Sequence, residues 1–119
     1  MTQEDRQILL KDICERVPYG VKINENTQGD FTVIGLTIER VFTTCETEGC
    51  HNDFPIECVK PYLFPLSSIT KKRLEELSEY IDIKNAYVAI ELLNSHHIDY
   101  RGLIEKGLAI DATELNIYC

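Results

Sequence analysis

A chain of 119 residues is close to the commonest domain size, so we expect a single domain over residues 1–119. Apolar residues make up 44% and charged residues 27%, which is an ordinary globular balance and excludes wholesale disorder. Twelve Lys and Arg against twenty Asp and Glu leave a net charge of −8, which repels a phosphate backbone and argues against nucleic-acid binding. Apolar runs are too short to span a bilayer and the start lacks the pattern of a secretory signal, so we expect a cytoplasmic, acidic protein that does not bind membranes.

The first predicted element is a helix that begins after Thr2. A threonine side chain can cap the first turn, and Glu4 and Asp5 complement the helix dipole there. Pro18 and Gly20 should end the helix. The apolar face at helical spacing comprises Ile8, Leu9, Leu10, Ile13, Cys14 and Val17.

A hairpin is predicted next. Val21 and Ile23 begin a short strand, and residues 24–30 are rich in turn formers. Residues 31–42 are predicted to form one long strand with Gly35 as a bulge or bend.

A third strand should follow a polar loop over residues 43–53. Residues 54–59 can return along the hairpin, and Pro61 should end this strand because proline cannot donate to a ladder. The apolar residues 62–64 lie between Pro61 and Pro65 without a clear period, and we expect them to fill the core between sheet and helices.

The C-terminal half is predicted to be mostly helical. A helix capped by Ser67, Ser68 or Thr70 would present Leu74, Leu77 and Ile81 on one face. Residues 85–95 fit a strand or a helix, and we favour a helix.

A short helix over residues 100–106 would close at Gly107, and residues 108–110 would pack back on the core. The fold class is therefore α+β, with a small antiparallel sheet of about three strands packed with three to four helices.

Five cysteines in a chain without an export signal are expected to be reduced. A zinc site at Cys45, Cys50, His51 and Cys58 is an alternative, but the spacing is poor, because four residues separate the first two cysteines and the histidine directly follows the second. We predict no bound metal and no cofactor. The cysteines are Cys14, Cys45, Cys50, Cys58 and Cys119.

The most informative stretch is residues 92–104, which contains two imidazoles, a carboxylate, a phenol and a guanidinium within six positions. In the structural interpretation, which we favour, a helix ends near His96, Asp99 caps the next short helix, and Arg101 or an imidazole satisfies free carbonyls or pairs with Asp99. Asp99→Ala and Arg101→Ala should then each destabilise the fold.

Two alternatives remain for this stretch. A small hydrolase would use His96 or His97 as a general acid or base held by Asp99, with Tyr100 or Arg101 stabilising negative charge, although no nucleophile lies nearby. A metal site would join the two histidines to Asp99 or Glu91, although adjacent histidines seldom point at the same ion. The candidate catalytic residues are His96, His97, Asp99, Tyr100 and Arg101.

Three segments together resemble a family of small uncharacterised proteins encoded by gut bacteria and their prophages or mobile elements. The segments are Val17-Pro18-Tyr19-Gly20-Val21, residues 59–68, and residues 93–109 with the run His96-His97-Ile98-Asp99-Tyr100-Arg101-Gly102. The resemblance covers nearly the whole chain and implies no activity, cofactor or catalytic residue. The cysteines at 45–58 and the basic first turn after Thr70 depart from the family pattern.

Together these observations predict a non-enzymatic protein-interaction or accessory module of a phage or mobile element. Its partner would be another protein or a second copy of this chain. The binding candidates are Tyr62, Phe64, Tyr100 and Arg101, since tyrosine and arginine concentrate binding energy at interfaces. The alternative for residues 62–64 is that they are simply core.

Overall fold

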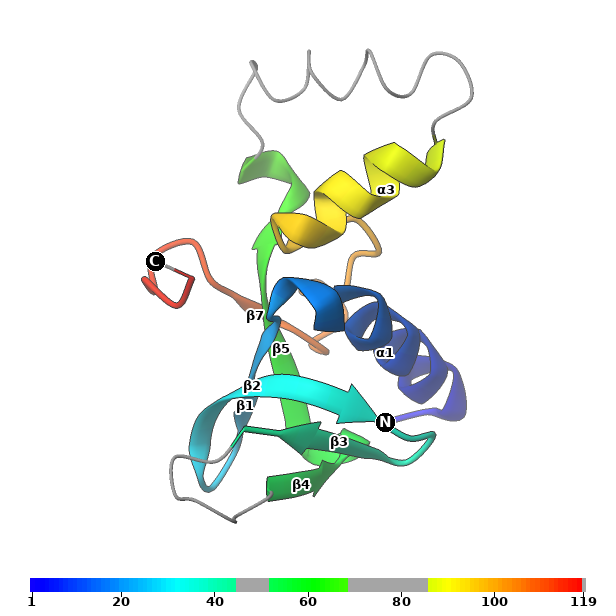
Figure 1. Ribbon diagram of the computed structural model, residues 1–119, viewed down its shortest axis with the longest axis vertical. Coiled ribbons are helices and arrows are strands. Elements are labelled where there is room, and N and C mark those ends of the chain that lie inside the picture. Colours follow the sequence, from blue (N-terminus) through cyan, green and yellow to red (C-terminus); the bar gives the residue numbers. More distant parts are fainter. Residues whose placement is uncertain (45–51, 69–85, 119) are drawn as a thin grey trace.

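The computed structural model describes residues 1–44, 52–68 and 86–118, and it has the predicted α+β class. Its seven strands form one sheet in the order β4-β3-β2-β1-β5-β6, with β7 also paired to β5 (Figure 1). The elements are α1 (Gln3–Arg16), β1 (Lys22–Glu25), β2 (Gly29–Leu36), β3 (Arg40–Thr43), β4 (Asn52–Pro55), β5 (Val59–Pro65), α3 (Ala86–Ser95), β6 (Ile98–Asp99) and β7 (Ile110–Asp111).

Helix α1 begins and ends where the sequence predicts. Thr2 and Asp5 form a capping box, in which the Asp5 N–H donates to Thr2 Oγ1 over 3.1 Å and the Thr2 N–H donates to Asp5 Oδ2 over 3.4 Å. After a 3₁₀ turn at Val17–Tyr19, Gly20 adopts a φ of 71°, which glycine tolerates without steric cost. The predicted face is wrong at Cys14, which is exposed.

Residues 31–42 form two strands rather than the single long strand predicted. The chain turns between Leu36 and Arg40, because the Thr37 N–H donates to the Arg40 carbonyl over 2.9 Å. The expected hairpin between β1 and β2 is present, and the register between β2 and β3 shifts between Val33 and Gly35, as expected for a bulge.

The predicted third strand over residues 54–59 is also wrong, since β4 ends at Pro55 and β5 starts at Val59 and runs through Pro61. Among the described residues, Val59–Pro61 pair with β1 on one side and with no strand on the other. Pro61 has no N–H, and on the side without a partner strand none is needed. Residues 62–64 therefore belong to a strand, and Tyr62 and Leu63 are buried.

The sheet is mixed and larger than the predicted three antiparallel strands. Strands β1 to β5 pair antiparallel, whereas β6 and β7 pair parallel with the second half of β5. Each of these parallel strands has two residues, which is too short to show a period in the sequence. Two α-helices are described instead of three or four, and α1 is the longer at 14 residues.

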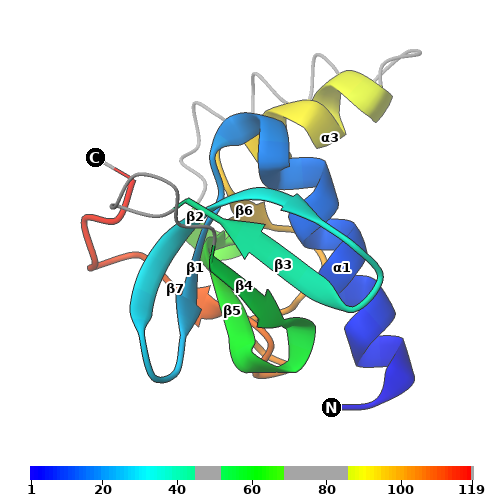
Figure 2. The ribbon, with the colours of Figure 1, turned by 60° about the horizontal axis from the view of Figure 1, so that its bottom comes forward.

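The hydrophobic core lies between α1 and the curved sheet. Figure 2 shows α1 along one side of the sheet that β1 to β4 form. Leu9 and Ile13 of α1 are fully buried there in one cluster with strand residues such as Ile23, Val41 and Leu63. Burial of this helix face stabilises the sheet it covers, at about 25 cal/mol per Å² of apolar surface removed from water.

The region after residue 85 is helical, as favoured, and α3 ends at Ser95, close to the expected boundary. The predicted helix over residues 71–81 lies outside the described residues. Residues 100–106 form bonded turns instead of the predicted short helix. Gly107 closes them at a φ of 75°, and the Leu108 N–H donates to the Leu103 carbonyl while the Gly107 N–H donates to that of Ile104, which is a Schellman arrangement.

Candidate functional site

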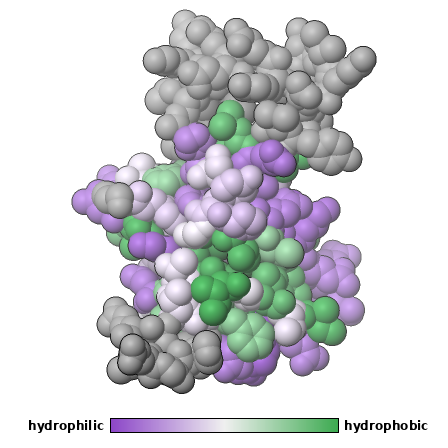
Figure 3. All heavy atoms as spheres, viewed as in Figure 1, coloured by the Kyte–Doolittle hydropathy of each residue, from purple (hydrophilic) through white to green (hydrophobic). Residues whose placement is uncertain are grey.

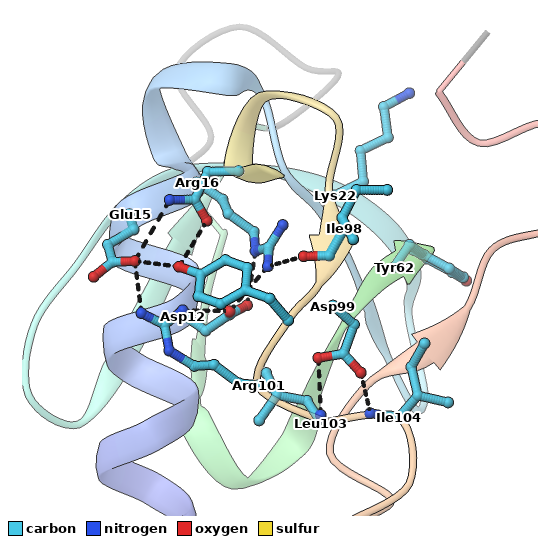
Figure 4. A network of polar contacts seen from close by, with 12 residues as sticks. Asp12, Glu15, Arg16, Lys22, Tyr62, Ile98, Asp99, Arg101, Leu103 and Ile104 are labelled. Carbon is cyan, nitrogen blue, oxygen red and sulfur yellow. Dashed lines mark hydrogen bonds and ion pairs between the residues drawn. The ribbon is translucent and has the colours of Figure 1, made fainter. Parts of the chain in front are cut away.

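A group of charged and polar side chains lies where α1 meets the chain that follows α3. Asp12 and Arg16 are fully buried one helical turn apart, and Arg16 donates from Nε to Asp12 Oδ2 over 2.9 Å. Arg16 Nη2 also donates to the carbonyl of Ile98 in β6 over 2.6 Å. We call this group the polar junction, and it comprises Asp12, Glu15, Arg16, Asn94, Tyr100, Arg101 and the backbone of Ile98 (Figure 4).

Arg101 ties the later chain to the same helix. Its guanidinium donates to Asp12 Oδ1 over 2.7 Å and to Glu15 Oε2 over 2.6 Å. The Tyr100 hydroxyl donates to the same Glu15 oxygen over 2.7 Å, and the Tyr100 ring lies 4.5 Å from the Arg101 guanidinium carbon. Two carboxylates therefore meet two guanidinium groups, which makes the junction neutral overall.

The electrostatics of the junction follow from these bonds. Burial acts to raise the pKa of Glu15, but the hydrogen bonds from Arg101 and Tyr100 outweigh it and leave that pKa below its usual value. Burial and the bond to the Glu15 carboxylate raise the pKa of Tyr100 to about 12. Tyr100 thus stays protonated at neutral pH and acts as a donor.

Asp99 performs the capping role that the sequence predicts, although it caps bonded turns instead of a helix. Its Oδ1 accepts the N–H of Leu103 and its Oδ2 accepts the N–H of Ile104, each over 2.9 Å. The predicted alternative, an ion pair between Asp99 and Arg101, is not formed in the described contacts, because Arg101 pairs with the carboxylates of α1. Arg16, which the sequence analysis did not consider, donates to the carbonyl of Ile98 in β6, beyond the end of α3.

His97 lies next to this junction, in a strained and buried position. Its φ is 56°, which costs a non-glycine residue about 1–2 kcal/mol. The ring is 6% exposed and stacks on Tyr118 with 3.8 Å between centroids. Burial, together with the Arg16 charge, lowers the pKa of His97 to about 4, so the imidazole is neutral at pH 7.

The hydrolase arrangement gains no support from this geometry. Asp99, which would hold the catalytic histidine, uses both oxygens on backbone N–H groups. His97 instead stacks on the ring of Tyr118. His96 is half-buried at the end of α3. Arg101 and Tyr100 donate to Glu15, so neither is free to stabilise developing charge on a substrate.

The cysteine site falls mostly outside the structure. Cys45, Cys50 and His51 lie outside the described residues, whereas Cys58 is half-buried and Cys14 is exposed. Among residues 1–44, 52–68 and 86–118, no group of three or more His, Cys, Asp or Glu side chains is placed to hold a metal ion. The prediction of no metal therefore stays a prediction for the whole chain.

The four predicted binding residues are spread over two places. Tyr62 is 6% exposed, and its hydroxyl donates to Asp30 over 2.5 Å, which together with burial raises its pKa to about 12. Phe64 is half-buried with its ring 6.0 Å from that of Tyr118, while Tyr100 and Arg101 face α1. These residues do not form one exposed patch.

The sequence analysis missed Asp12, Glu15, Arg16 and Tyr118. A signal was available for Asp12 and Arg16, because they are four residues apart on the face that also carries Leu9 and Ile13. Charged residues on an apolar helix face indicate a buried pair. Tyr118 gave no such signal, since its partners are far away in the sequence.

No family model matches this chain, and comparisons with curated proteins and with solved structures gave no match. No helix in the described part of the chain has the length and apolar character needed to cross a membrane.

Proposed function

We propose that the protein is a non-enzymatic protein-interaction module, consistent with an accessory role in a phage or mobile element. One observation carries the proposal: Ile38 is 81% exposed in the turn between β2 and β3. Ile34 on β2 is 52% exposed, and Phe42 on β3 is half-buried. We call Ile34, Ile38 and Phe42 the β2–β3 patch.

The strand pattern supports one outward face for this patch. Val41 and Thr43 are buried, so the alternation of side chains along β3 directs Phe42 to the opposite face. Ile34 follows the buried Val33 at the register shift, directly before Gly35, which pairs with Phe42. Hydrophobic side chains gather over β2 and β3 on the face seen in Figure 3. Contiguous apolar exposure is typical of a binding surface.

The turn that carries Ile38 is held in one conformation. The Thr37 side chain accepts the N–H groups of Glu39 and Arg40 over 3.4 and 3.2 Å, and the Thr37 N–H donates to the Arg40 carbonyl. Because the turn is already ordered, less conformational entropy is lost when Ile38 enters a partner. The isoleucine is thus a preorganised apolar anchor.

Charge supports a partner with an apolar recess bordered by basic side chains. The positive charge of Arg40 is paired with Asp53 at 2.5 Å, whereas Glu39 beside Ile38 is exposed. The whole chain carries a net charge of −8. Such a balance disfavours phosphate backbones and favours a basic protein surface.

The test compares Ile38→Ser with Ile90→Ser, a matched change at a 39% exposed isoleucine on α3. A protein captured from nuclease-treated host lysate is purified, and its affinity for each variant is measured. Burial of an isoleucine contributes about 1.5–3 kcal/mol, so Ile38→Ser should weaken binding about 10- to 100-fold. Ile90→Ser should bind as the parent does, and high salt should slow association.

Three outcomes would contradict the proposal. The first is equal affinity of Ile38→Ser and the parent for the captured protein. The second is recovery of a partner only when DNA or RNA is intact. The third is turnover of a substrate by the pure protein. Sedimentation of the pure protein tests a second copy as the partner, and in that case Ile38→Ser should shift the dimer to monomer.

A further inference from the structure

In the C-terminal segment, residues 113–118, the Tyr118 side chain bonds to two strands of the sheet. The Lys22 N–H of β1 donates to the Tyr118 hydroxyl oxygen over 2.9 Å, and that hydroxyl donates to the Tyr62 carbonyl of β5 over 2.7 Å. Just before the segment, the Ala112 N–H donates to the Leu63 carbonyl over 2.8 Å. Tyr118 therefore joins the end of the chain to two strands that lie far from it in sequence.

The ring of Tyr118 also stacks on the ring of His97. The two rings are nearly parallel, with 13° between their planes. His97 Nδ1 is a buried atom without a hydrogen-bond partner among the described residues. A proton added at Nδ1 would create a buried N–H donor without an acceptor, which is unfavourable.

The charges around this stack are set by several elements. Helix α1 contributes Arg16 and Asp12, and their charges act on Tyr118, while Arg16 also acts on His97. His96 is the titratable neighbour on the same segment. Strands β1 and β5 contribute Lys22 and Tyr62, which contact Tyr118 through backbone atoms. A cationic His97 would lie beside the fully buried Arg16 guanidinium.

We propose that His97 and Tyr118 form an acid-sensitive clasp, which holds residues 113–118 against β1 and β5 while His97 is neutral and releases them when His97 is protonated.

The direction of the pH effect follows from linkage. Burial and Arg16 lower the pKa of His97 to about 4 in the closed clasp, and release of residues 113–118 removes the burial that Tyr118 provides, so this pKa rises towards its ordinary value of about 6.5. The open state therefore binds more protons, so the closed state is fully favoured above about pH 6.5 and loses stability as the pH falls towards about 4. With these two values, the opening equilibrium rises about 30-fold between pH 8 and pH 5.

Hydrogen exchange of single amides tests the clasp in the full chain. Protection of the Lys22 and Ala112 amides, corrected for the intrinsic pH dependence of exchange, should fall about 30-fold between pH 8 and pH 5. The Val33 amide, which donates to the Val21 carbonyl over 3.0 Å within the sheet, should keep its protection. Equal loss of protection at Val33 would overturn the proposal, because it would indicate global destabilisation.

Variants separate the two halves of the clasp. His97→Asn, whose new side chain tolerates positive φ and carries no charge, should abolish the pH dependence, and His96→Gln should keep it. Tyr118→Phe retains the stacked ring but loses both hydrogen bonds, so it should lower protection at every pH and keep the 30-fold ratio. If His97→Asn fails to fold, NMR titration of the parent decides, and a His97 midpoint at or above 6.5 would sink the proposal.

Discussion

Asp99 holds the turn that follows it, because its two carboxylate oxygens accept the backbone N–H groups of Leu103 and Ile104. The side chain is 6% exposed, so water cannot easily replace these bonds. A buried carboxylate in a cluster of polar residues can be mistaken for a catalytic group when only the sequence is known. Its bonds indicate a structural role.

Asp99→Ala should lower the free energy of unfolding by about 1–3 kcal/mol, since it strands two N–H donors. Chemical denaturation measures the change. Asp99→Asn, which keeps one acceptor oxygen, should cost less. Glu105→Ala, at an exposed position in the same segment, is the matched control and should stay within about 0.5 kcal/mol of the parent. An unchanged denaturation midpoint for Asp99→Ala would contradict the structural role and favour the interpretation of Asp99 as a catalytic residue.

Two arginines join helix α1 to the segment that follows α3, and each of these two parts of the chain contributes one of them. Arg16 reaches from the helix to the carbonyl of Ile98, and Arg101 reaches back to Asp12 and Glu15. The two arginines share the Asp12 carboxylate, which is fully buried. Because each buried charge has a partner of opposite sign, the desolvation cost of the junction is offset.

Arg101→Ala should destabilise the fold by about 1–3 kcal/mol, because it leaves Glu15 without its guanidinium and Asp12 with only Arg16. Arg101→Lys should recover only part of this stability, because a lysine keeps the positive charge but its single ammonium group cannot reproduce the bonds that the two guanidinium nitrogens make to Asp12 and Glu15. The control is Arg40→Ala, which breaks an ion pair with Asp53 whose side chains are 44% and 41% exposed and should cost under about 1 kcal/mol. Equal urea midpoints for Arg101→Ala and Arg40→Ala would contradict this interpretation.

The described residues form one hydrophobic core between α1 and a mixed sheet. Polar contacts at the edge of this core join α1 and the C-terminal segment to the sheet. The chain ends are joined to this unit, with α1 at one end of the sequence and Tyr118 at the other. The whole chain carries twenty acidic residues against twelve Lys and Arg. We expect this excess to act on solubility and on encounter with a basic partner.

The purified protein should contain no stoichiometric metal. Cys45 and Cys50 have poor spacing for a zinc knuckle, and the described residues hold no group suited to a metal ion. Elemental analysis after dialysis measures this directly. Zinc at one equivalent, with thermal stability lost on chelation, would show the prediction to be wrong.

Local signals in the sequence determined α1 with its cap, the β1–β2 hairpin, the bulge near Gly35 and the capping role of Asp99. Each depends on residues within about five positions of one another, where backbone preference and hydrogen-bond reach act directly. The same reasoning failed at Pro61, because whether proline ends a strand depends on which sides of that strand have partners.

The tertiary structure alone decided the parallel pairing of β6 and β7 with β5, the bond between Arg16 and Ile98, and the contacts of Tyr118. Arg16 and the Ile98 carbonyl are 82 residues apart, and Tyr118 and Lys22 are 96 apart. Such contacts form because the packed core brings distant segments together, and neither a two-residue strand nor a contact between distant residues has a periodic signature in a sequence. The composition and periodicity of the chain thus determined its class and elements such as α1 and the β1–β2 hairpin, whereas the partners of the buried polar groups were decided by the fold, which brings residues from distant segments within hydrogen-bond reach.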